Sequence, residues 1–398
     1  MTDLLKSRMR YSRSTLNDRL IIFTHVLHYR VGDKVVAHGP YVNEINELAK
    51  RVPEVVIVGP LVLQTESISP DNIPYVKTPR IISLPVVGGN SVLNKLSYLW
   101  YGPVLIFQLL KGIRTPGTLH PRAPGSVALL AMILIALVGR KKKKFAKFAG
   151  EWDSPRAMPT TFRWQRNWLI KKWLFNGPVF VYTSLQNPSH VIPSFTSNLR
   201  QEEIVKANML GVKKQLDGKL ILAVAGRLVK NKGVDVLLQA LAIVNKASTE
   251  WELLIMGDGL ERDTLQKQAE DLGIAKNIKW LGWCSQESMR LYFQQAHIIC
   301  QPTRFTESWG KVLQEGMVYG CIPVASAIGG LQRQLASRPE LLFEPGNAAQ
   351  CGAIIGNIVT GKLNYETLKN WSIVQSELYS LNALVDFTCN KYNEYYPS

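Results

Sequence analysis

The stretch that decides the fold is residues 220–259, which read LILAVAGRLVKNKGVDVLLQALAIVNKASTEWELLIMGDG. The apolar runs at 220–225 and 251–256 each predict a buried strand, and each run stops at a glycine. Between them, residues 234–244 have the composition and length of an apolar helix. Because strand, helix and strand in succession form the unit of a parallel sheet, this stretch predicts an α/β domain.

The same alternation continues towards the C-terminus. Further strands are expected at 278–282, 297–301 and 322–325, and further helices at 260–272, 286–295 and 310–319. Repeated alternation of this kind predicts a doubly wound parallel sheet, in which the carboxyl ends of the strands share one edge.

The first half of the chain shows a similar but less regular alternation of strands and helices. Strands are expected at 19–26, 55–58 and 178–183, with a helix at 42–52, and the proline-containing polar stretch 186–199 is interpreted as a linker. A chain of 398 residues suits two domains. We therefore expect domains at 1–195 and 196–375, and a C-terminal helix within 376–398 that crosses back to the first domain.

The positive charge is confined to one half. The chain has a net charge of +17, and residues 1–200 hold 27 basic and 10 acidic residues, whereas residues 201–398 hold 20 of each. Twelve Lys or Arg and no acidic residue lie between Asp71 and Glu151. The first half is therefore expected to carry a strongly positive surface.

Three segments of this basic half bear on membrane contact. Residues 126–139 are apolar but too short to cross a hydrocarbon core of ~30 Å, so a buried helix is expected there, followed by the basic run 140–144. Residues 92–113 mix apolar and basic side chains and are expected to break at Gly102-Pro103. Residues 163–175 hold three Trp and four basic residues, which suits either an interfacial helix or a helix packed on its own domain. An anionic membrane surface is the expected partner.

The cysteines and the N-terminal residues indicate in which cellular compartment the protein is expected. Five cysteines without CxxC or Cys/His spacing favour neither a disulfide framework nor a zinc site, and they indicate a reducing compartment. Residues 1–14 lack the apolar core of a signal peptide. We expect a cytoplasmic protein that is peripheral on the cytosolic face of the membrane.

The loop after the strand at 220–225 has the chemistry of a phosphate site. Ligands of open α/β sheets bind outside the carboxyl ends of the strands. Here Arg227 and Lys232 follow Gly226, and a guanidinium can bind two phosphate oxygens while Lys adds a mobile charge. The loop is neither a Walker A motif nor GxGxxG, and the alternative is a solvated basic turn.

A second motif is the stretch from Glu307 to Glu315, which reads ESWGKVLQE. Ser308 is expected to cap a helix that begins near Trp309 or Gly310, leaving free amide groups that stabilise an anion. The two glutamates can accept hydrogen bonds from hydroxyl groups, which suits a sugar. The alternative is a pair of solvated surface charges.

These motifs, together with 323–326 and Gly329-Gly330, resemble the donor-binding half of retaining glycosyltransferases of family GT4. The likeness covers most of 195–375. Less closely, 120–125 and 149–152 are similar to acceptor-domain loops of polysaccharide-building members of the family. The resemblance implies the GT-B fold, an α/β architecture of two Rossmann-like doubly wound domains facing across a cleft.

The resemblance also implies roles for individual residues. Arg227 and Lys232 would bind the donor diphosphate, Glu307 the sugar hydroxyls and Glu315 the ribose hydroxyls. The family keeps a His near the reacting sugar in an HxH-like loop that reads His120-Pro121-Arg122 here, so either His120 or Arg122 would serve that position. The implied catalytic residues are Glu307, Arg227, Lys232 and His120. The implied donor-binding residues are Gly226, Arg227, Lys232, Gly257, Gly310, Lys311, Val312 and Glu315.

The expected activity is transfer of a hexose from a nucleotide-diphosphate sugar to a lipid-linked or polysaccharide acceptor, with retention and without a cofactor. No Asp-x-Asp pair occurs in the second half, so we expect Arg227 and Lys232 to replace a divalent metal ion. Alternatives are a GT-B nucleotide-sugar epimerase and a non-catalytic sugar-nucleotide scaffold. Nucleic-acid binding is disfavoured because the lysine run lacks the aromatic and glycine pattern of RNA modules.

Overall fold

The computed structural model describes residues 15–63, 69, 71–87, 92–153, 158–183, 187–245, 250–305 and 307–397, without the side chains of 92–99 and 245. The N-terminal stretch 1–14, on which the expectation about a signal peptide rests, lies outside these residues. The chain divides into two compact units. Of the described residues, 196–380 form one unit, and 15–195 together with those from 381 onwards form the other.

The unit of residues 196–380 is built on a parallel sheet, for which six strands are described. Their order is β13-β12-β11-β14-β15-β16. The bounds are β11 (Leu220–Ala225), β12 (Trp251–Met256), β13 (Ile278–Gly282), β14 (Ile298–Gln301), β15 (Ile322–Ser326) and β16 (Leu342–Phe343). The chain runs outward from β11 to β13 and then returns to β14 on the other side of β11. The carboxyl ends of β11 and β14 therefore mark a topological switch point, where such sheets bind ligands.

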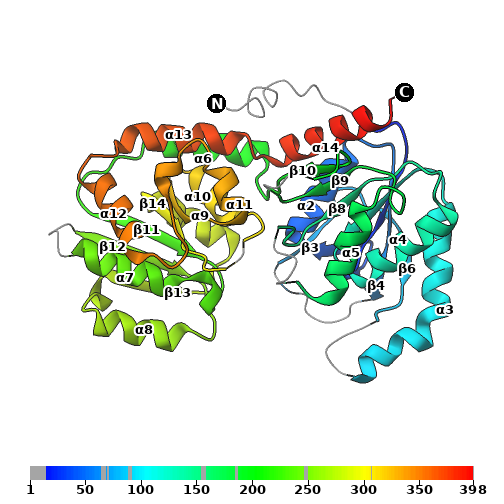
Figure 1. Ribbon diagram of the computed structural model, residues 1–398, viewed down its shortest axis with the longest axis horizontal. Helices are drawn as coiled ribbons and strands as arrows, with labels where there is room; N and C mark the ends of the chain where they lie inside the picture. The colour runs from blue at the N-terminus through cyan, green and yellow to red at the C-terminus, as the bar shows by residue number, and fades with distance from the viewer. Residues whose placement is uncertain are drawn as a thin grey trace. The chain divides into compact units, whose positions relative to one another are not determined.

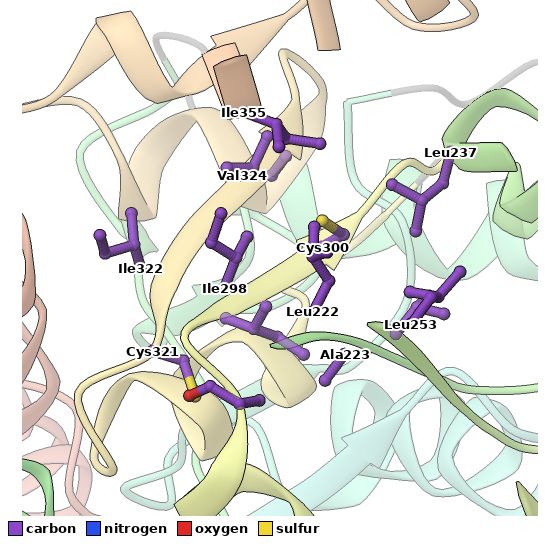
Figure 2. Close-up of a cluster of buried hydrophobic side chains, with 14 of the residues drawn as sticks. Leu222, Ala223, Leu237, Leu253, Ile298, Cys300, Cys321, Ile322, Val324 and Ile355 are labelled. Carbon is purple, nitrogen blue, oxygen red and sulfur yellow. The ribbon is translucent and has the colours of Figure 1, made fainter. Parts of the chain in front are cut away.

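Helices cover both faces of this sheet (Figure 1). One face carries α7 (Val234–Asn245), α8 (Arg262–Asp271) and α12 (Ala348–Val359). The other carries α6 (Gln201–Val212), α9 (Gln286–Gln295), α10 (Lys311–Met317) and α13 (Tyr365–Glu377), while α11 (Gly329–Gln334) follows β15. Figure 2 shows the side chains that seal the sheet to its helices, among them Leu222, Ile298 and Ile355.

The second unit has a larger mixed sheet, with ten strands among the residues described. Its order is β10-β9-β8-β7-β1-β4-β2-β3-β5, with β6 also paired to β4. The parallel strands are β1 (Leu20–Phe23), β4 (Val55–Leu63), β6 (Arg80–Leu84), β7 (Thr118–Ala123), β8 (Ala146–Phe148), β9 (Val179–Val181) and β10 (Val191–Pro193). At one end, β2 (His28–Val31), β3 (Lys34–His38) and β5 (Asn72–Pro74) pair in antiparallel fashion. The predicted fold class, two α/β units with parallel sheets, is confirmed.

The helices of this unit are α2 (Gly39–Ala49), α3 (Val92–Arg114), α4 (Ser126–Val138), α5 (Thr160–Ile170) and α14 (Leu381–Tyr395). The expected buried helix at 126–139 is confirmed as α4, whose Ala131, Met132 and Ile135 lie in the core. No helix within the described ranges is long and apolar enough to cross a membrane. All five cysteines are free thiols, and four of them are buried.

The link between the two units near the C-terminus lies later than the expected position 375/376. Helix α13 continues through that position to Glu377, and the second unit resumes at Leu381. From there α14 packs on α2, and Arg51 donates to the Asp386 carboxylate at 2.9 Å.

Three expected helix bounds were wrong. Helix α3 continues through Gly102-Pro103, where a break was expected. Its C-terminal half packs Leu105 and Leu109 into the core, and this burial outweighs the local effect of the proline. Helix α5 ends at Ile170, and α10 begins only after Gly310, which has φ +75°.

Candidate functional site

The candidate site lies at the switch point, outside the carboxyl ends of β11 and β14. A hollow of about 270 Å³, open to solvent, is lined by residues from both strand ends. These include Gly226, Arg227 and Lys232 from the β11 side and Gln301 and Pro302 from the β14 side. Lys232 and Glu307, which are 75 positions apart in the sequence, thus meet at the edge where α/β sheets bind ligands.

Glycines let the loops around this hollow approach one another. A Cβ on Gly257 would lie 1.9 Å from the carbonyl oxygen of Gly226, and Gly257 has φ +146°. A Cβ on Gly233 would lie 1.9 Å from the carbonyl oxygen of Pro302. Any side chain at these two positions would therefore push the strand ends apart.

Among the described residues, the charged groups at the hollow are Arg227 and the ion pair of Lys232 with Glu307. Lys232 Nζ lies 2.7 Å from Glu307 Oε2, with 29% and 15% of the two side chains exposed. Arg227 is exposed, and its guanidinium forms no hydrogen bond or ion pair with the residues that the structure describes. Since the lysine and the glutamate neutralise each other, Arg227 leaves a net positive charge that suits an anionic ligand.

Gln301 is a site residue that the sequence analysis did not single out. Its Nε2 donates to Glu307 Oε2 at 2.9 Å, so Glu307 is held from two sides. The Oε1 atom of Gln301 is buried without a hydrogen-bond partner among the described residues. Its position as the last residue of β14 was the signal that could have identified it.

The expected capping role of Ser308 is wrong. The residue before α10 is Gly310, in the left-handed region, and no side-chain hydrogen bond caps the helix. A Cβ on Gly310 would lie 2.8 Å from Gln301 Oε1. Gly310 therefore lies beside the group that holds Glu307.

Lys311 and Glu315 belong to a second group of polar side chains. Asn198 Nδ2 donates to Glu315 Oε1 at 3.1 Å, and Lys311 Nζ donates to Asn198 Oδ1 at 3.3 Å. Burial raises the pKa of Glu315. Glu315 lines a different hollow, of about 410 Å³, whose wall also includes Arg290. The structure therefore groups Glu307 with Arg227 and Lys232, and Glu315 with Asn198 and Lys311.

Val312 is half-buried against the hydrophobic core, so its side chain contributes packing to α10. Asn198 was not singled out from the sequence either, because nothing in its local pattern indicates that it contacts a residue 117 positions later.

In the unit that contains residues 15–195, His120 and Arg122 both form contacts with neighbouring residues of that unit. The His120 ring is 1% exposed, stacks on Phe145 at 4.1 Å and makes a hydrogen bond through Nδ1 to the carbonyl oxygen of Phe145. Burial, with the neighbouring Arg122 charge, lowers the pKa of His120 to about 3, so its imidazole is neutral at pH 7. The Arg122 guanidinium binds both carboxylate oxygens of Glu44, at 2.9 and 3.1 Å. The catalytic role of either residue stays a prediction.

No group of three His, Cys, Asp or Glu side chains suited to a metal ion occurs within the part of the chain that the structure describes. The cations at the hollow are Arg227 and Lys232.

Comparison with known proteins identifies relatives of part of the chain. Residues 208–372 match the family model of the group 1 glycosyl transferases. D-inositol 3-phosphate glycosyltransferase of Corynebacterium urealyticum is 31% identical over 173 residues, which are 42% of this chain and 40% of the relative. An uncharacterised glycosyltransferase of Methanocaldococcus jannaschii is 32% identical over 138 residues, which are 34% of each chain. The matches thus span less than half the length of these curated relatives.

Solved structures resemble nearly the whole chain. A glycosyltransferase from Rickettsia africae has a TM-score of 0.62 at 14% identity, covering 96% of this chain and 99% of its own. Anabaena HepE in complex with UDP has a TM-score of 0.62 at 14% identity, covering 95% and 100%. At such low identity these structures establish the fold, which is GT-B. Residues 208–372 match the group 1 glycosyl transferases, and together the comparisons support a GT-B glycosyltransferase.

Proposed function

We propose that this protein transfers a hexose from a nucleotide-diphosphate sugar to a lipid-linked or polysaccharide acceptor. The observation that carries the proposal is the unpaired Arg227 beside the Lys232–Glu307 ion pair at the switch point of the sheet. A site for a diphosphate sugar needs cations for the phosphates and a carboxylate for the hydroxyl groups. Arg227 and Lys232 line this hollow, and the Glu307 carboxylate is paired with Lys232.

The charges also suit the chemistry of the reaction. As the bond to the sugar breaks, negative charge grows on the departing diphosphate, and fixed cations stabilise it most at the transition state. Arg227 would bind the diphosphate without first giving up another partner. Lys232 would exchange Glu307 for a phosphate oxygen, which would free the Glu307 carboxylate to accept hydrogen bonds from the sugar.

Glu315 is proposed to bind the ribose of the donor. Asn198 would orient its carboxyl group, and Lys311 holds the amide of Asn198 in turn. A nucleotide donor is further supported by the UDP bound to the structurally similar Anabaena HepE.

Retention of anomeric configuration and independence of a metal ion are proposed on the resemblance to family GT4. In such a reaction the acceptor hydroxyl attacks the face from which the diphosphate departs, and a phosphate oxygen helps to accept the hydroxyl proton. We also propose that the acceptor is reached at an anionic membrane surface on the cytosolic side, because the acid-poor half of the chain is strongly basic.

The test uses radiolabelled UDP-glucose, UDP-galactose, UDP-N-acetylglucosamine and GDP-mannose with a bacterial membrane extract. Transfer of label into a lipid or polymer fraction supports the proposal. Arg227→Ala and Glu307→Gln should each lower transfer at least 100-fold, about 2.7 kcal/mol in the barrier, with the fold intact.

The matched control is Lys219→Ala, because Lys219 precedes β11 at the opposite edge of the sheet. It should retain normal transfer. Wild-type rates in both site variants would contradict the proposed site. Isomerised free donor would indicate an epimerase, and nucleotide binding without any turnover would indicate a scaffold.

A further inference from the structure

We infer that the solvent-facing side of α3 inserts into the interface of an anionic lipid bilayer. This stripe consists of Trp100, Val104 and Phe107, followed by Lys111 and Arg114. The inference deepens the proposed function, which names an anionic membrane as partner, by assigning the surface that makes the contact.

The stripe is one face of the helix. Its members follow one another at intervals of four, three, four and three residues, which places them in a row along an α-helix. Trp100 is 86% exposed, Phe107 63% and Val104 50%. A helix face turned to water normally carries polar side chains, so three large apolar side chains in a row indicate a binding surface.

The opposite side of α3 is already occupied. Leu105, Leu109 and Ile113 are fully buried against the sheet and α4. Figure 1 shows α3 as the cyan helix at the periphery of its unit. Since the buried side fixes the helix in place, the exposed stripe is presented as a rigid element.

The charges around the stripe select an anionic surface. Lys111 and Arg114 are exposed at its C-terminal end, and Arg140 and Lys141 are exposed just after α4, the helix that packs on α3. Helix α4 itself ends in exposed Leu137 and Val138. No acidic residue occurs between Asp71 and Glu151 to repel a negative leaflet. Apolar side chains flanked by Lys and Arg are what an interfacial helix requires.

Two lysines of the basic run 140–144, which was considered for membrane contact in the sequence, cannot take this role. Lys144 is 1% exposed, and its Nζ donates to the carbonyl oxygens of Arg140 and Lys142 and to Asn176 Oδ1. Lys142 Nζ donates to the carbonyl oxygen of Thr115 at 2.6 Å. Of the five residues in this run, only Arg140, Lys141 and Lys143 are exposed.

Helix α5 is also less suited to insertion. Trp164 is exposed, but Trp168 packs against the core and Arg166 Nε donates to the carbonyl oxygen of Trp152. The tryptophans of 163–175 therefore do not form one exposed face, whereas the apolar members of the α3 stripe do.

The test is sedimentation of the full chain with sucrose-loaded vesicles, either of phosphatidylcholine alone or with 30% phosphatidylglycerol. The variant is Trp100→Glu combined with Phe107→Glu, which changes two exposed positions and should leave the fold intact. The matched control is Val374→Glu, an exposed apolar residue on α13 in the other unit. Wild type and control should bind the anionic vesicles, and the double variant should bind at least tenfold more weakly.

Salt separates insertion from simple charge attraction. In 1 M NaCl, where the Debye length is ~3 Å, wild type should keep part of its binding because apolar insertion is not screened. Unchanged binding of the double variant, or wild-type binding that disappears completely in salt, would overturn the inference. So would a self-association that the double variant abolishes in sedimentation velocity without vesicles, since a second copy would then cover the stripe.

A nucleotide-binding measurement distinguishes failure of the proposed function from failure of the membrane inference. If no nucleotide sugar raises the melting temperature of the wild type, the proposed function fails, whereas vesicle binding is judged independently. If the double variant binds nucleotide normally but no longer sediments with vesicles, both proposals are supported.

Discussion

The carboxylate of Glu44 lies between two cations, the half-buried Arg122 and the buried Lys147. It accepts two hydrogen bonds from Arg122 and lies 2.9 Å from Lys147 Nζ, and these cations hold the pKa of Glu44 well below its usual range. Glu44→Gln would leave both cations without a counter-charge, so we expect a loss of about 3–5 kcal/mol in the free energy of unfolding. Urea denaturation measures it. Glu54→Gln, which removes a partly exposed pair with Arg19, should cost less than about 1 kcal/mol, and equal losses would contradict the argument.

Buried His120 makes stability depend on pH. Its pKa in the folded chain is about 3, below the ordinary value of 6.5, so the unfolded chain binds the extra proton first as the pH falls. The contribution of His120 to stability is therefore present above pH 6.5 and is lost as the pH falls towards 3. Between pH 7 and pH 5 that loss is about 2 kcal/mol.

The measurement compares His120→Asn with wild type by urea denaturation at both pH values. The variant is expected to be less stable at pH 7 because it loses the stack on Phe145. Its decrease in stability from pH 7 to pH 5 should nevertheless be smaller by about 2 kcal/mol. If the two proteins lose equal stability over this range, the His120 ring is not the group that titrates.

At the scale of residues, the sequence predicted the charged groups of the candidate site but not the amides that hold them. Arg227, Lys232 and Glu307 follow strand ends, and their chemistry alone suggests phosphate and sugar. Gln301 and Asn198 are neutral, and amides are common on protein surfaces. Their roles depend on the side chains that the fold brings to them, which a local pattern does not specify.

At the scale of elements, α10 depends on the conformation of the glycine before it. Gly310 has φ +75°, and a Cβ there would lie 2.4 Å from Leu331 Cδ2. Gly361 has φ +74°, with nothing within 4 Å of the Cβ position. Gly361→Ala should cost about 1–2 kcal/mol for the left-handed backbone alone. Gly310→Ala should cost about 1–3 kcal/mol more because of overpacking.

Urea denaturation gives the two free energies of unfolding, and a nucleotide thermal-shift assay adds a second readout. Because Gly310 lies beside Gln301, Gly310→Ala should also weaken donor binding, whereas Gly361→Ala should not. Equal losses in the free energy of unfolding would show that the clash between the new Cβ of Gly310→Ala and Leu331 is relieved without a cost in stability.

The elements with the clearest signals were predicted best. The strands β11, β12 and β13 have the expected bounds because each is an apolar run that ends at or before a glycine. Helix α9 begins where expected because Ser285 caps it by accepting a hydrogen bond from the Ser288 amide at 3.1 Å. In contrast, α3 was interrupted in the prediction at Pro103, since the sequence does not show how much surface the helix buries beyond that proline.

At the scale of the whole molecule, the sequence predicted two α/β units, from its length and its strand–helix alternation, and it predicted the location of the charge excess. It did not predict the antiparallel strands β2, β3 and β5, which are short and only partly buried and therefore have weak apolar patterns. The expectation of a C-terminal helix that crosses back did not specify which side chains it would bring to the unit that contains residues 15–195. Phe387 of α14 lies among aromatic rings of that unit, 6.2 Å from Phe180 and 6.1 Å from Phe195.

This contact predicts that α14 stabilises one unit selectively. Phe387→Ala removes a buried aromatic side chain and should cost about 3–5 kcal/mol. Hydrogen exchange should then show lost protection in α2, β8 and β9, while β11 to β15 keep theirs, because local stability follows the unit in which the contact is made. Val374→Ala, at an exposed position of α13, should change neither set. Equal loss of protection in both sheets would mean that the two units unfold together, and α14 would then be a link in one cooperative structure.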